Sequence, residues 1–382
     1  MKKILVVHNK YRERGGEDIA VDNEINILKR NYEVDVLYFE NYFKNPFIQF
    51  IYFIFNKNFN SMRLLESKIQ LFNPDLVYLH NTWFNASVGL FKTLEKHNIK
   101  TLIKLHNFRY SCTRFFLAKK HIKNSTLCGA CSFENKPFQI FNKYYENSYL
   151  KSFMVYRHGK SLFKYLLKSN FMVSVLTDHH RDFLNTIGIN NEKIITSPNY
   201  LEIESDSNNI DIEDYIVYAG RVSKEKGVEE LIKSFLDCKF QNTKLKIIGD
   251  GPSFKNLQTK YLSKNIEFSG LLTNSETIDI IAKSKCVVTA TKLYEGQPTL
   301  LCEASLMKKP SIFPSYGGMG EFFPKDYQLK FKQGDYKDLT KKILLTQNSD
   351  LLNKIGKENY SFIKKKIKQS NYFSDLEGIL KS

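Results

Sequence analysis

Two cations flank a predicted turn in the second half of the chain. Arg221 and Lys226 follow the apolar run of residues 215–219 and precede a helical pattern that begins at Val228. A guanidinium binds two oxygens of a diphosphate in a fixed fork, an ammonium adds a mobile point charge, and a helix N-terminus favours an anion. These residues predict a diphosphate site, and the alternative is an ordinary solvated turn.

Two glutamates flank the predicted start of another helix. Proline suits the first turn of a helix, so we expect one to begin near Pro298, with Glu295 just before it and Glu303 about a turn and a half inside it. Carboxylates at two depths can accept hydrogen bonds from the sugar and the ribose of a sugar nucleotide, although solvated helix charges would look the same. The residues at the predicted helix start are Gly296, Gln297, Pro298 and Thr299.

Two pairs of glycines also follow apolar runs. Gly15 and Gly16 come after residues 4–8, and Gly249 and Gly251 come after residues 245–248. Glycine permits a positive φ and a close approach of the backbone to a ligand, and a tight turn without a ligand would use it equally well. Glu17 and Asp18 come next in the first half, where either can face an acceptor hydroxyl or cap the following helix; capping is the expectation for Asp18.

Two histidines each end an apolar run of the first half. His80 and His106 should therefore point into a cleft between domains. For both, the alternative is a structural histidine that is hydrogen-bonded to the backbone.

The elements that must position these residues alternate between short apolar runs and helical patterns, which is typical of parallel α/β sheets. A first series of strands is followed by a polar, acidic stretch and then by a second series. We therefore expect domains at residues 1–205 and 206–360, with a helix at 361–382 that packs back on the first domain. The predicted strands are residues 4–8, 34–39, 76–80, 101–106, 171–177, 215–219, 245–248, 266–269, 286–289 and 311–314.

The second half of the chain resembles the donor site of retaining GT-B glycosyltransferases of family 4, the glycosyltransferase group 1. The resemblance lies in Arg221 with Lys226, followed by Glu295 with Glu303 in an E-x7-E pattern. The resemblance implies an α/β fold of two Rossmann-like domains whose parallel sheets face each other across a cleft. It implies that Arg221 and Lys226 neutralise the diphosphate, that Glu303 binds the ribose, and that Glu295 contacts the transferred sugar. It also places His106 near that sugar, which makes His106 the preferred catalytic histidine, and it places the glycine loop of the first domain near the phosphates.

The implied reaction moves a sugar from a nucleoside-diphosphate sugar to a hydroxyl of a glycan or polyprenyl-diphosphate-linked acceptor, with retention of configuration. Such a reaction serves bacterial cell-surface polysaccharides, such as lipopolysaccharide O-antigen, capsule or exopolysaccharide. No cofactor is required for catalysis, and no D-x-D pair follows a predicted strand to hold a cation. Two rivals are a sugar-nucleotide 2-epimerase of the same architecture, which the E-x7-E pair disfavours, and a basic nucleic-acid-binding protein. No nucleic-acid-binding motif supports the latter, so we expect no nucleic-acid partner.

Three cysteines lie close together in the sequence. Cys112, Cys128 and Cys131 offer thiolates at a spacing that suits a structural zinc ion, and His106 or His121 can complete four ligands. Reduced, partly buried thiols are the alternative.

The net charge of +17 is concentrated in the first half. Residues 41–170 hold 20 basic and 5 acidic side chains, so this part can face an anionic membrane surface, although a general Lys and Asn bias is the alternative. Residues 47–55 are apolar and too few to span a bilayer, so they form either an interfacial segment or a buried core helix. With no signal peptide recognised, we expect a cytoplasmic protein that is peripheral on the inner face of the cytoplasmic membrane.

Overall fold

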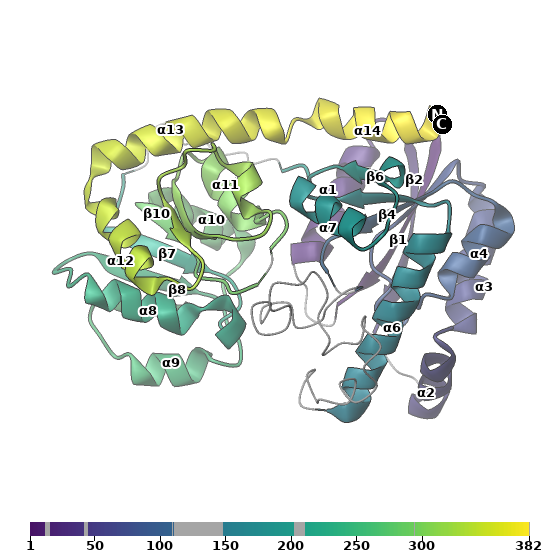
Figure 1. The fold of residues 1–382 in the computed structure, drawn as a ribbon, viewed down its shortest axis with the longest axis horizontal. Coiled ribbons are helices and arrows are strands. Elements are labelled where there is room, and N and C mark those ends of the chain that lie inside the picture. Colours follow the sequence, from purple (N-terminus) through teal and green to yellow (C-terminus); the bar gives the residue numbers. More distant parts are fainter. Residues whose placement is uncertain are drawn as a thin grey trace. The chain divides into compact units, whose positions relative to one another are not determined.

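The computed structural model describes residues 1–11, 16–41, 45–108, 110, 148–201, 211–293 and 295–381. The chain forms two compact units. The first unit comprises Met1–Tyr200 and Gln369–Ser382, and the second comprises Leu201–Lys368 (Figure 1). The boundary lies at Tyr200, near the predicted residue 205, and the chain returns to the first unit at Gln369 rather than near residue 361.

The first unit is built on a six-stranded sheet in the order β2-β1-β3-β4-β5-β6, and every neighbouring pair is parallel. Its central strands are buried along almost their whole length, which explains why they appear in the sequence as continuous apolar runs. The strands are β1 (Lys3–Lys10), β2 (Glu33–Glu40), β3 (Leu76–Leu79), β4 (Thr101–Leu105), β5 (Met172–Val175) and β6 (Ile194–Thr196).

Helices cover both faces of this sheet. The apolar faces of α1 and α14 pack on one face, where Tyr372, Leu376 and Ile379 of α14 join a core with Ile4 and Val6 of β1. Helices α3 and α4 lie on the other face (Figure 1). The last helix of the chain is thus part of the first unit. The helices are α1 (Gly16–Leu28), α2 (Pro46–Phe55), α3 (Phe59–Phe72), α4 (Leu90–His97), α6 (Tyr149–Lys168), α7 (Asp178–Thr186) and α14 (Gln369–Lys381).

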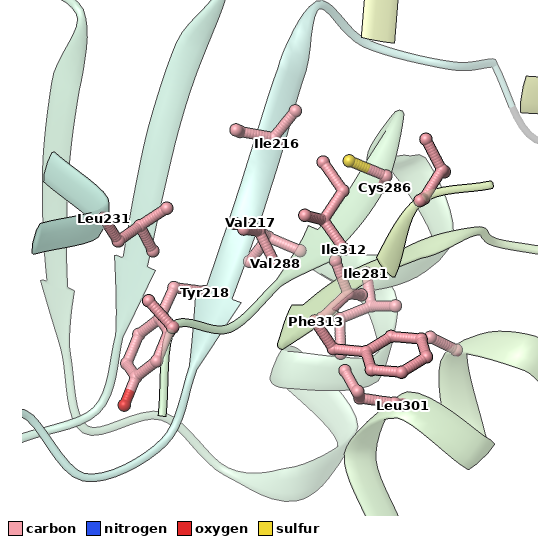
Figure 2. Close-up of a cluster of buried hydrophobic side chains, with 14 of the residues drawn as sticks. Ile216, Val217, Tyr218, Leu231, Ile281, Cys286, Val288, Leu301, Ile312 and Phe313 are labelled. Atoms are coloured by element: carbon pink, nitrogen blue, oxygen red, sulfur yellow. The ribbon is translucent and has the colours of Figure 1, made fainter. Parts of the chain in front are cut away.

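The second unit has its own six-stranded parallel sheet, in the order β12-β11-β10-β7-β8-β9. Its strands are β7 (Tyr215–Ala219), β8 (Lys244–Ile248), β9 (Ile266–Gly270), β10 (Cys286–Val288), β11 (Ser311–Ser315) and β12 (Lys330–Lys332). Its helices are α8 (Val228–Asp237), α9 (Phe254–Lys260), α10 (Asn274–Lys283), α11 (Thr299–Leu306), α12 (Tyr336–Leu344) and α13 (Ser349–Lys366). Side chains of β7, β10 and β11 interlock with those of α8, α10 and α11 in its core (Figure 2).

The observed elements confirm the predicted α/β class with two parallel sheets. All ten predicted strands are present with shifts of one or two residues at their ends. Two strands were missed, β6 and β12, because each has only three residues and neither forms an apolar run long enough to recognise. The helical pattern that ends the chain is two helices, α13 and α14, which are separated at Ile367.

The strand order identifies where each sheet can bind a ligand. The chain reverses direction across the sheet between β1 and β3 in the first unit, and between β7 and β10 in the second. In open α/β sheets the loops diverge at such a point and leave a crevice at the carboxyl ends of the strands. A ligand site is therefore expected among the residues that follow β1, β3, β7 and β10.

Candidate functional site

The loops after β7 and β8 are joined by backbone hydrogen bonds. The amide of Val222 donates to the carbonyl of Asp250 at 2.9 Å, and the amide of Ser253 donates to Val222 at 3.0 Å. Gly249 has a φ of +118°, and a Cβ there would lie 2.1 Å from the carbonyl oxygen of Gly220. A Cβ on Gly251 would lie 2.5 Å from the carbonyl oxygen of Val222. Contact between the two loops therefore explains both glycines without a ligand.

An ion pair connects the loop after β7 to the loop after β10. Lys226 Nζ lies 2.6 Å from Glu295 Oε1, and the hydroxyl of Thr291 donates to the same oxygen at 3.1 Å. The two charged side chains are 29% and 27% exposed, so solvent can reach both. The structure thus brings together two predicted site residues from the two sides of the switch point.

Gly227 allows this loop to approach β10 closely. Its φ is +67°, and a Cβ built on it would lie only 2.1 Å from the carbonyl oxygen of Ala290. Any other residue would push the loop that carries Lys226 away from the end of β10.

The helix near Glu303 begins as the sequence predicts. Pro298 is the N-cap residue, and α11 starts at Thr299. Glu303 lies one turn inside α11, where burial raises the pKa of its carboxyl to about 7. Gln297 is buried at the helix start. Arg221 is exposed, and its own carbonyl oxygen accepts a hydrogen bond from the hydroxyl of Tyr218 at 2.8 Å.

In the first unit the residues after β1 contact those after β4. Gly15 lies outside the described residues, and Gly16 begins α1. The carboxylate of Glu17 accepts hydrogen bonds from the hydroxyl of Tyr11 at 2.8 Å and from the side-chain amide of Asn107 at 3.1 Å. Glu17 is thus held at the end of the sheet.

Asp18 lies in the first turn of α1, where the sequence predicted a helix cap. Its carboxylate lies 2.9 Å from His8 Nε2 and 3.3 Å from the backbone amide of Tyr11. Asp18 therefore ties the helix to the end of β1. The contact of Asp18 with His8 was not predicted, although His8 ends the predicted strand of residues 4–8.

The two predicted histidines meet at the ends of β3 and β4. His80 Nδ1 lies 3.0 Å from His106 Nε2, and the rings are stacked. Burial lowers the pKa of both well below the usual range of histidine, so both are neutral at pH 7. They line an open pocket together with Glu17, Trp83, Asn107 and His158.

A buried ion pair behind this pocket was also missed. Lys104 of β4 pairs with Glu24 of α1, and both side chains are at most 1% exposed. The available signal was the charged residue inside the apolar run of residues 101–105, because lysine is rarely fully buried without a partner.

The predicted metal ligands Cys112, Cys128 and Cys131 lie outside the described residues. Within the part of the chain that the structure describes, no three His, Cys, Asp or Glu side chains are grouped to hold a metal ion. The described thiols are Cys238, Cys286 and Cys302, and all three are free.

Helix α2 presents apolar side chains to solvent. The exposed fractions are 41% for Phe50, 36% for Ile51, 38% for Ile54 and 62% for Phe55. The interpretation of residues 47–55 as a buried core helix is therefore wrong for these four positions. None of the helices in the described ranges is both long and apolar enough to cross a bilayer.

Part of the chain matches a known protein family. Residues 201–362 match the family model described as Glycosyl transferases group 1. The putative teichuronic acid biosynthesis glycosyltransferase TuaC of Bacillus subtilis (strain 168) is 29% identical over 116 residues, which cover 30% of this chain and 28% of that protein. The amylovoran biosynthesis glycosyltransferase AmsD of Erwinia amylovora is 26% identical over 162 residues, which cover 40% of this chain and 46% of that protein. The chain thus spans less than half the length of either relative.

Solved structures share the fold of the whole chain. The structure of Anabaena Alr3699/HepE in complex with UDP-glucose has a TM-score of 0.69, covers all of both chains and is 14% identical in sequence. This likeness confirms the predicted α/β fold of two Rossmann-like domains.

We predict that Gly227→Ala destabilises the second unit more than Gly270→Ala. Both glycines have a left-handed φ, +67° and +71°, but a Cβ on Gly270 would have no atom within 4 Å. The backbone strain of about 1–2 kcal/mol applies to both, and overpacking adds about 1–3 kcal/mol at Gly227 only. Urea unfolding measures the difference, and equal losses of stability would show that the contact with Ala290 does not hold the loop.

Proposed function

We propose that this chain, whose second unit is a glycosyl transferases group 1 domain, transfers a sugar from a nucleoside-diphosphate sugar to a hydroxyl of a glycan or lipid-linked acceptor. The observation that carries the proposal is the group of charged side chains at the carboxyl ends of β7 and β10. There Lys226 pairs with Glu295, and Arg221 stands exposed on the same loop as Lys226. This is the switch point of the sheet, where open α/β sheets bind ligands.

The chemistry follows from where charge develops. As the bond from the anomeric carbon to the phosphate oxygen breaks, negative charge grows on the leaving diphosphate and positive charge grows on the sugar. A guanidinium and an ammonium near the diphosphate stabilise the first change, and a carboxylate beside the sugar stabilises the second. Arg221, Lys226 and Glu295 supply these groups.

The ion pair of Lys226 does not prevent this role. Partly exposed ion pairs contribute about 0–1 kcal/mol to stability, so the lysine can turn toward a bound diphosphate at little cost. A diphosphate carries more negative charge than one carboxylate, which favours that movement. Glu295 would then be free to face the transferred sugar.

Glu303 is proposed to bind the ribose. Its carboxyl lies one turn inside α11, where it is partly exposed and can reach a ligand, although burial raises its pKa. Ribose hydroxyls donate to an ionised carboxylate more strongly than to a neutral carboxylic acid. The ionisation of Glu303 should therefore be coupled to nucleotide binding.

The open pocket of the first unit is proposed to bind the acceptor. Aromatic, amide and imidazole side chains line it, a mixture that suits sugar hydroxyls and ring faces. Retention of configuration follows the group 1 resemblance, and the names of TuaC and AmsD support a place in the synthesis of bacterial surface polysaccharides.

We also propose that α2 attaches the first unit to an anionic membrane surface. Lys57 lies two residues after the exposed Phe55, and Lys92 lies close enough to lower the pKa of Lys57. Apolar side chains flanked by cations bind the boundary between headgroups and acyl chains. A lipid-linked acceptor would be met at that surface.

We predict that Arg221→Ala lowers the affinity for uridine diphosphate by about 10-fold to 100-fold, the equivalent of one or two hydrogen bonds to a charged group. Lys224→Ala is the matched control, because Lys224 is an exposed cation on the same loop. Isothermal titration calorimetry measures both variants. Unchanged affinity in Arg221→Ala, or an equal loss in the control, would remove the diphosphate role of Arg221.

We predict that nucleotide affinity rises with pH between about 6 and 8, as the Glu303 carboxyl with its pKa of about 7 loses its proton. Glu303→Gln should flatten this dependence. Isothermal titration calorimetry across this pH range tests the coupling, and a wild-type affinity independent of pH would contradict it.

The raised pKa of Glu303 also affects stability. The folded protein keeps a proton that the unfolded chain has lost, so the free energy of unfolding should fall as the pH rises from 4.5 to about 7.

We predict that the double variant Ile54→Ser with Phe55→Ser floats with vesicles containing anionic lipid several-fold less than the wild type. Leu71→Ser is the control, because Leu71 is an apolar residue 83% exposed at the far end of α3. Flotation at low salt measures the bound fraction. Binding that survives in the double variant, or is absent in the wild type, would argue against attachment through α2.

A further inference from the structure

A chain of buried polar contacts leads from α1 to the pocket of the first unit. Glu24 Oε1 accepts from the ammonium of Lys104, and Glu24 Oε2 faces His80 Nε2 at 3.7 Å. On the other side of the His80 ring, Nδ1 lies 3.0 Å from His106 Nε2. His80 and Glu24 are fully enclosed, with side chains 0% and 1% exposed, whereas His106 is partly exposed and lines the pocket.

The charges along this row of polar contacts determine which nitrogen carries the proton in His80 and in His106. Glu24 Oε2 and His80 Nε2 are buried atoms with no hydrogen-bond partner within normal distance. If His80 were protonated on Nδ1, the lone pair on its Nε2 would face the carboxylate in a buried site, where repulsion is strong. A proton on His80 Nε2 instead points toward the carboxylate and benefits both atoms.

The proton on His80 then decides the state of His106. A neutral imidazole has one donor and one acceptor nitrogen, so His80 Nδ1 becomes the acceptor of their shared hydrogen bond. His106 must donate from Nε2, and its Nδ1 keeps a lone pair. No partner for His106 Nδ1 is found among the described residues, and the ring borders the pocket.

We propose that Glu24 and His80 are positioning residues that hold His106 as the Nε2–H tautomer, so that its Nδ1 accepts a hydrogen bond from a substrate hydroxyl bound in the pocket. This assignment of the substrate rests on the proposed transferase function; the tautomer itself does not. The buried ion pair with Lys104 then has a purpose beyond stability. Burial raises the pKa of Glu24, and the ammonium of Lys104 acts against that rise, so it favours the carboxylate that orders the protons on both rings.

The tautomers are measured directly by long-range proton–nitrogen NMR on the full chain labelled with nitrogen-15 in histidine. His80→Gln and His106→Gln identify the two sets of signals. We expect Nε2 to be protonated and Nδ1 to be bare in both rings at neutral pH. A His106 ring that is protonated on Nδ1, or on both nitrogens, would overturn the proposal.

Glu24→Gln provides the sharpest variant. The amide oxygen of the glutamine can accept from Lys104 while its amide NH₂ donates to His80 Nε2. The donor and acceptor roles along the row from residue 24 through His80 to His106 are then reversed. We expect both histidines to change to the Nδ1–H tautomer and transfer to fall by about tenfold, the equivalent of one hydrogen bond. Unchanged tautomers in folded Glu24→Gln would refute the role of Glu24.

A control separates this role from a general structural one. His97→Gln alters a partly exposed histidine on α4 that pairs with Glu66, and it should leave the signals of His80 and His106 unchanged. If Glu24→Gln fails to fold, the wild-type tautomers alone decide the proposal. The expected tautomers without any sugar transfer would refute the proposed function and leave the proton order intact.

Discussion

The geometry of the second unit depends on how a parallel sheet gathers the ends of its strands. Lys226 follows β7 and Glu295 follows β10, yet their charged atoms lie 2.6 Å apart because these strands are neighbours and point the same way. Gly227 makes the contact sterically acceptable. Without that close approach the loop after β7 would lose the pairing of Lys226 with Glu295, on which the proposed diphosphate site depends.

The first unit uses buried charge for a different purpose. Removing Glu24 and Lys104 from water costs several kcal/mol for each ion, and their attraction rarely exceeds that cost by much. A buried pair of this kind is weak evidence for stability. Its position next to His80 points to control of proton order instead, since one oxygen of the buried carboxylate faces His80 Nε2.

The sequence predicts the parts of this account that depend on local pattern. Apolar runs mark buried strands, and the residues after them, such as Arg221 and His106, are found at the carboxyl ends of the sheets. Pro298 marks the start of α11 within one residue. Contacts between distant segments could not be predicted. The position of Glu24 in the sequence is typical of any charged residue on a helix, and none of its neighbours in the sequence indicates that it contacts Lys104. The pairing of Lys226 with Glu295 likewise depends on strand order, which the sequence does not display.

A crystal structure of the full chain with uridine diphosphate tests the proposed donor site most directly. We expect the diphosphate oxygens to lie within hydrogen-bonding distance of Arg221 and Lys226, with the ribose beside Glu303. A nucleotide bound away from the carboxyl ends of β7 and β10, with both cations left in solvent, would contradict it.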